Sequence, residues 1–131
     1  MRSGMGLKMP TNTPSEHAEQ CHVIQWAVLE SRRNPKLNLL FAIPNGGRRS
    51  IGVAKKMKAE GVKAGIPDLF LPITSAFYNG LFIEMKKKTG GTLSKEQKQW
   101  ISLLSRENYR VQVCKGADEA IKVIKNYLSI K

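Results

Sequence analysis

The chain has few acidic residues for its length. Only 10 Asp and Glu stand against 22 Lys and Arg among 131 residues, so the formal net charge is +12. An excess of this size favours a polyanionic partner such as nucleic acid, the alternative being a surface of solvated lysines.

Cysteines are also scarce, and long apolar runs are missing. Cys21 and Cys114 belong to no CxxC or CxxH cluster, so we expect neither a structural zinc site nor a secreted disulfide framework. No segment approaches the roughly 18 apolar residues of a membrane span, and the N-terminus lacks the apolar segment of a signal peptide. This composition fits a cytoplasmic protein without a membrane partner.

The length and the apolar pattern predict one α/β domain. We expect a disordered leader over 1–14, rich in Gly, Thr, Asn and Pro, and a single domain over 15–131. Periodicity and capping residues predict helices over about 15–31, 50–61, 94–106 and from 116 onward. Apolar runs predict strands over 37–43, 69–73, 80–86 and 109–113, the middle two paired as an antiparallel hairpin. This order is typical of a mixed sheet flanked by helices.

Two acids and a lysine lie in the strands of this hairpin. Successive strand residues face opposite sides, so Glu84 and Lys86 project together, and Asp68 begins the neighbouring strand. Two carboxylates that converge at a strand end suit Mg²⁺ or Mn²⁺, and a lysine beside the metal can orient water or neutralise charge on a phosphate. In a basic protein this pattern indicates phosphodiester hydrolysis. The alternative is an exposed Glu84–Lys86 pair on an edge strand, which would contribute little.

Longer segments of the sequence resemble a known family of nucleases. Pro67-Asp68, followed by Glu84-Met85-Lys86, is similar to the PD-(D/E)XK nuclease signature. The segments IPNGG, AEGVKAGIPDLFLP, YNGLFIEMK and LSKEQKQW resemble the VRR-NUC family, in particular its small stand-alone viral and bacterial members. The similarity runs over about 15–128. It implies a restriction-endonuclease-like αβββαβ core and a metal-dependent DNA endonuclease in a bacterial or phage-infected cell.

The resemblance also implies roles for individual residues. Asp68 and Glu84 would be metal ligands, the carbonyl of Met85 would complete the metal shell, and Lys86 would be the catalytic lysine. Gln97 matches a glutamine of the family and would line the active site, in addition to forming a capping box with the serine three residues before it.

The family also has a glutamate on its first helix, and two residues here fit that position. We prefer Glu16 as the additional metal ligand because it stands four residues before Gln20, which places both on one helical face. Glu19 is the alternative, its other interpretation being an ordinary solvated helix acid.

Basic and polar residues near this centre are candidates for DNA contact. Glycines in the NGGRRS loop let a phosphate approach the backbone, its arginines add charge, and the following helix offers an N-terminus that favours anions. The predicted contacts are Asn45, Arg48, Arg49, Ser50, Lys55, Lys63 and Lys87.

The resemblance implies a homodimer that cuts branched DNA, because stand-alone members resemble Holliday-junction resolvases. The preferred DNA structure and the number of metals stay open. A non-catalytic nucleic-acid-binding module on the same fold is the main alternative, and cleavage of RNA is a third.

Overall fold

The protein folds around a four-stranded sheet, seen in a computed structural model that describes residues 13–45 and 50–129. The expected leader over 1–14 falls outside these ranges except for Thr13 and Pro14. The strands follow the order β1-β2-β3-β4, with β1–β2 and β2–β3 antiparallel and β3–β4 parallel. They are β1 (Phe41–Ala42), β2 (Leu69–Leu71), β3 (Leu81–Lys86) and β4 (Arg110–Lys115). The sheet is therefore mixed, as predicted.

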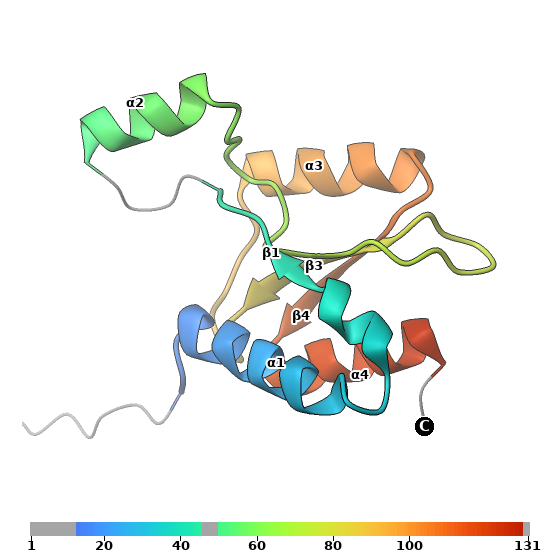
Figure 1. Cartoon of the computed structure of the whole chain (residues 1–131). Helices are drawn as coiled ribbons and strands as arrows, with labels where there is room; N and C mark the ends of the chain where they lie inside the picture. Colours follow the sequence, from blue (N-terminus) through green and yellow to red (C-terminus); the bar gives the residue numbers. More distant parts are fainter. Residues whose placement is uncertain (1–12, 46–49, 130–131) are drawn as a thin grey trace, which may run out of the picture.

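Helices cover both faces of this sheet (Figure 1). On one face lie α1 (Glu16–Glu30) and α4 (Ala117–Leu128), and α3 (Lys95–Arg106) lies on the other. The helix α2 (Ile51–Ala59), placed in the chain between β1 and β2, stands apart from the rest of the body. Without α2 the order is αβββαβ followed by α4, which confirms the expected restriction-endonuclease-like fold.

The helices begin where the capping residues predict. The side chains of Ser15 and Ser50 accept hydrogen bonds from the backbone N–H groups of Ala18 and Val53. At α3 the predicted capping box is present in both directions between Ser94 and Gln97. Each cap satisfies backbone donors that the first helical turn leaves unpaired.

The apolar core lies between the sheet and the α1–α4 layer. One face of β3 supplies Leu81, Ile83 and Met85, all at most 1% exposed. They join buried residues of both helices, including Val23 and Ile124. The opposite face of β3 is therefore left for Phe82, Glu84 and Lys86, and this face looks toward α3.

One expected strand is mostly absent. The run over 37–43 was predicted to be a strand, but Pro35–Leu39 forms a 3₁₀ helix, η1, and only Phe41–Ala42 joins the sheet. Asn34 caps this turn by accepting a hydrogen bond from Lys36 N–H, and the turn buries Leu37 against α1 and the core. The periodicity of a short apolar run does not distinguish the two conformations, and the structure buries only Leu37 of this run.

No helix within the described ranges is long and apolar enough to cross a membrane.

Candidate active site

The register of the β2–β3 hairpin brings the two predicted acids together. Leu69 pairs with Ile83 and Phe70 pairs with Phe82, so the next step of the same antiparallel ladder places Asp68 opposite Glu84. Residues directly opposite on one face of such a ladder have Cβ atoms about 4.5–5.5 Å apart. The convergence of the two carboxylates is therefore a consequence of strand pairing.

Asp68 is held by contacts to both of its oxygens. Its Oδ2 accepts a hydrogen bond of 2.7 Å from the backbone N–H of Met85, and its Oδ1 accepts one of 3.2 Å from the side-chain amide of Asn45. Asn45 follows β1, whose pairing with β2 continues through the hydrogen bond from Ile43 N–H to the Asp68 carbonyl. Three strands thus fix the orientation of one carboxylate.

Gln97 joins the acid and the lysine of β3. Its Nε2 donates to Glu84 Oε2 at 3.1 Å, while its Oε1 accepts from Lys86 Nζ at 3.1 Å. The same Oε1 also accepts from the Ser94 N–H at 2.8 Å, so the capping box and the site share one side chain. Lys86 Nζ lies 3.9 Å from Glu84 Oε2. Glu84 and Lys86 project together as alternation predicts, but they form a buried pair and not an exposed one.

The surroundings of Glu84 shift the pKa of its carboxyl group strongly. Burial, then the charge of Asp68 and hydrogen bonding with it, raise the pKa of Glu84 to about 9, and the neighbouring Lys86 offsets only part of this shift. The Oε1 atom of Glu84 is buried and has no hydrogen-bond partner. A carboxyl oxygen of this kind, beside a second carboxylate, can share a proton with Asp68 or bind a cation in its place.

The donor set fits a hard divalent cation in part. Among the described residues, no group of three His, Cys, Asp or Glu side chains is placed to hold a metal ion. Asp68 and Glu84 therefore offer two carboxylates, and the remaining ligands would come from backbone carbonyls, water or substrate. This is the usual arrangement for Mg²⁺, which keeps several waters and binds through one or two carboxylates plus phosphate oxygens.

The two candidate acids of α1 have different surroundings. Glu16 is exposed, and its charge acts on Glu84, where it also raises the pKa. Glu19 is only 3% exposed and its Oε1 accepts a hydrogen bond of 3.1 Å from Ala117 N–H, at the start of α4. The interpretation of Glu19 as a solvated acid is wrong, because this side chain ties α1 to α4.

A close backbone approach sets the position of Asp68 relative to α3. Gly65 adopts φ +85°, and a Cβ on it would lie 2.6 Å from Glu96 Cβ and 2.9 Å from the backbone nitrogen of Gln97. Only glycine combines this conformation with this contact. This contact joins the turn to residues of α3 that are distant in sequence, so it is visible only in the fold.

The predicted DNA-contacting residues do not share one environment. Asn45 supports Asp68, and Ser50 caps α2. Lys55 and Lys63 are exposed on and after α2, whereas exposed Lys87 lies with Glu16 along a separate cleft near the start of α1. Arg48 and Arg49 lie outside the described residues. DNA contact by this set stays a prediction.

Comparison with known proteins identifies a family that matches most of this chain. The family model of the VRR-NUC domain matches residues 8–118. Among solved structures, a VRR_NUC domain protein is similar at 33% sequence identity with a TM-score of 0.75, and the match covers 92% of this chain and 93% of that one. None of the curated proteins matches.

Proposed function

The chain belongs to the VRR-NUC family and is a nuclease-type domain, and on this premise we propose that it is a Mg²⁺- or Mn²⁺-dependent endonuclease that hydrolyses DNA phosphodiester bonds, with a preference for branched DNA. One observation carries the metal-dependent mechanism: buried Glu84 Oε1 has no partner, in a carboxyl paired with Asp68 and adjoining Lys86. A cation would satisfy that oxygen in place of the proton that the raised pKa keeps on Glu84.

Asp68 and Glu84 would hold the metal, together with the carbonyl of Met85. When bound, a divalent cation polarises a phosphoryl oxygen and lowers the pKa of a water molecule. Glu16 would act through water, since it is exposed on α1 but electrostatically linked to Glu84. Glu19 stays the alternative ligand: its Oε1 binds the backbone of α4, while its Oε2 is buried without a partner.

Lys86 would orient the attacking water or stabilise the negative charge that develops on the phosphate. Its side chain is 8% exposed, and Gln97 fixes the ammonium through one hydrogen bond. A lysine already held in place loses little conformational entropy when the substrate arrives. Gln97 is a positioning residue in this scheme, because it contacts both the acid and the lysine.

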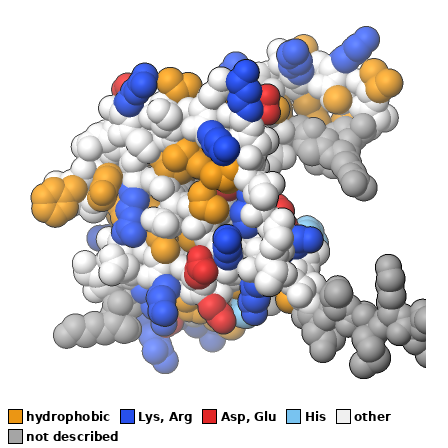
Figure 2. Space-filling view, turned by 180° about the vertical axis from the view of Figure 1, so that it is seen from behind, with side chains coloured by type: hydrophobic (Ala, Val, Ile, Leu, Met, Phe, Trp, Pro, Cys, Tyr) orange, Lys and Arg blue, Asp and Glu red, His pale blue; other side chains and the backbone are white. Residues whose placement is uncertain are grey.

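The surface would hold the phosphate backbone. Figure 2 shows basic side chains on α2, at the upper right, and around an apolar patch in the middle of that face. Such a distribution attracts a polyanion and makes its binding dependent on salt.

The test is cleavage of labelled branched and linear DNA duplexes by purified protein in Mn²⁺, Mg²⁺ or EDTA, with an RNA duplex alongside. We expect cleavage only with the metals and faster cutting of branched DNA. Lys86→Ala should lower the rate by about 100-fold or more while DNA binding persists. Lys122→Ala is the matched control, since it removes an exposed lysine from α4 on the other side of the sheet.

Cutting that persists in EDTA and in Lys86→Ala would exclude this mechanism. Binding without any cleavage by the wild type would favour the alternative, a non-catalytic nucleic-acid-binding module. Faster cutting of the RNA duplex would replace the DNA assignment. The proposed homodimer is tested separately by measuring the molar mass in solution.

A further inference from the structure

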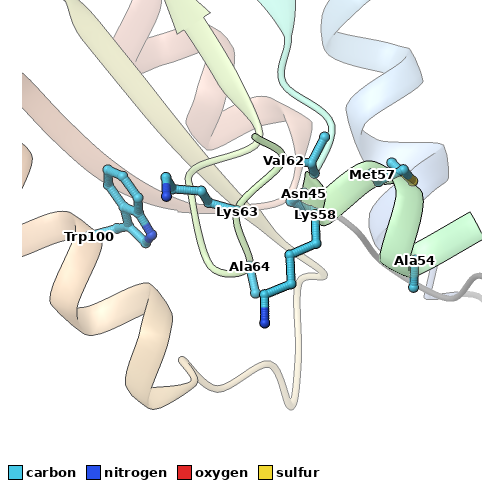
Figure 3. Close-up of a pocket in the computed structure, with 8 residues that line it drawn as sticks. All are labelled: Asn45, Ala54, Met57, Lys58, Val62, Lys63, Ala64 and Trp100. Atoms are coloured by element: carbon cyan, nitrogen blue, oxygen red, sulfur yellow. The ribbon is translucent and has the colours of Figure 1, made fainter. Parts of the chain in front are cut away.

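A cleft opens between α2 and α3, beside the candidate active site. Its volume is about 540 Å³, within the range of ligand pockets in proteins. Figure 3 shows side chains from three segments around it: Met57 and Lys58 from α2, Lys63 from the loop that follows, and Trp100 from α3. This cleft is not part of the metal and lysine centre described above.

The lining combines an aromatic ring with positive charge. The Trp100 side chain is half-buried, and the apolar atoms of Met57 and Val62 lie along the same cleft. Lys58 and Lys63 are exposed, and the Lys63 side chain extends toward Trp100 (Figure 3). A flat apolar ligand that carries negative charge would use both features. A nucleobase with its flanking phosphates has this chemistry, since bases stack on aromatic side chains and lysines bind phosphate.

The cleft adjoins the candidate active site through Asn45 and α3. Asn45 lines the cleft and donates its side-chain hydrogen bond to Asp68. On α3, Trp100 stands three residues after Gln97, which places the two side chains on neighbouring turns of one helical face. A nucleotide in the cleft would therefore lie close to the phosphate that is cut.

A base inside an intact duplex cannot enter such a cleft, because stacking and pairing hold it in the helix. An unpaired base at a junction, flap or mismatch pays little to leave the stack. A second copy of this chain is a less suitable occupant, since the chain carries a net charge of +12 and both surfaces would bear lysines.

We propose that this cleft binds one unpaired nucleobase of the DNA substrate, with the base stacked on Trp100 and its flanking phosphates near Lys58 and Lys63. This inference rests on the proposed nuclease function and specifies its substrate as DNA with an unpaired nucleotide next to the cut.

The first test uses the wild-type protein. Two branched DNAs are compared, identical except that the unpaired nucleotide at the junction carries a base in one and is abasic in the other. Fluorescence anisotropy with Ca²⁺ should show at least about fivefold tighter binding of the DNA that carries the base, as expected for one stacked base. A 2-aminopurine at the same position should lose fluorescence on binding.

Variants then assign the effect to the ring. Trp100→Leu should remove the difference between the two DNAs, and Trp100→Phe should keep most of it. Leu103→Ala is the matched control, because Leu103 is an exposed apolar residue of the same helix outside the cleft. Lys63→Ala should weaken binding of both DNAs by a similar factor and reduce the salt dependence.

Equal affinity of the wild type for the two DNAs, with unchanged 2-aminopurine fluorescence, would overturn the inference even if Trp100→Leu failed to fold. Loss of dimers in Trp100→Leu, with DNA preference intact, would assign the cleft to contact between copies. Cleavage in Mn²⁺ is measured in parallel. Cutting without a base preference rejects only the cleft, and a base preference without cutting rejects only the catalytic proposal.

Discussion

Helices α2 and α4 both mix apolar residues with lysines, yet they differ in what they bury. In α4, Ala120 and Ile124 are fully buried in the core. In α2 no residue is buried, and Ile51 is 77% exposed. Stability therefore comes from the α1–α4 layer beneath the sheet, while the α2 side leaves both apolar and basic groups available for a partner.

The largest expected difference in stability is between a substitution in α4 and one in α2. Ile124→Ala should lower the free energy of unfolding by about 2–5 kcal/mol, because it leaves a cavity in the closed layer. Met57→Ala in α2 should cost less than about 1 kcal/mol, since the side chain is only half-buried. Urea unfolding followed by circular dichroism measures both. Similar losses would mean that α2 packs as a core element.

Substitutions on the two faces of β3 should also differ in their effects, one on cleavage and the other on stability. Glu84→Gln should reduce cleavage by about 100-fold or more, because the proposed metal ligand is lost. Its thermal stability in EDTA should stay equal to the wild type or rise, since the amide resembles the protonated acid that a pKa of about 9 favours. Ile83→Ala, on the opposite face, should instead destabilise strongly. A large loss of stability in Glu84→Gln would contradict this division.

Metal binding should depend on pH through Glu84. Its pKa is raised from 4.5 to about 9, so the folded metal-free protein retains a proton that the unfolded chain releases. Between these values, the free energy of unfolding without metal should fall as the pH rises.

A cation that displaces this proton should bind up to about tenfold more tightly per pH unit over the same range. Calorimetry of Mn²⁺ binding in two buffers of different ionisation enthalpy counts the proton released. Glu84→Gln is the control and should show none. An affinity independent of pH would show that Glu84 is not the ligand.

Two glycines near α2 should respond to alanine in opposite directions. Gly52→Ala should stabilise by about 0.5 kcal/mol, because nothing lies within 4 Å of the added methyl group and alanine favours a helix. Gly65→Ala should destabilise by at least about 1 kcal/mol and lower cleavage, since it pushes the Asp68 segment away from α3. Thermal melting and the cleavage assay measure both. Stabilisation by Gly65→Ala would show that this close approach is not required.

Much of the fold was predictable because its signals are local. The serine caps and the capping box at Ser94 and Gln97 marked helix starts correctly. Two apolar runs with a polar turn gave the β2–β3 hairpin, and alternation along β3 placed Glu84 and Lys86 on one face. The strand expected over 37–43 was wrong because burial of Leu37 is compatible with a 3₁₀ turn as well.

The site was less predictable where it depends on partners distant in sequence. The hydrogen bond from Asn45 to Asp68 and the tie from Glu19 to Ala117 join residues that no local pattern connects. Trp100 is half-buried and lines the cleft between α2 and α3. The apolar character of this residue does not by itself predict whether it packs in the core or lines a surface cleft.

By itself, the sequence determined where the helices and the hairpin form and which residue types the site contains, because capping, alternation and charge act over a few residues. Only the tertiary structure decided that Glu84 is a buried acid with an unpartnered oxygen, that Gln97 links it to Lys86, and that α2 stays outside the core. Those properties arise from burial and from long-range contacts, which exist only once the sheet and helices have packed.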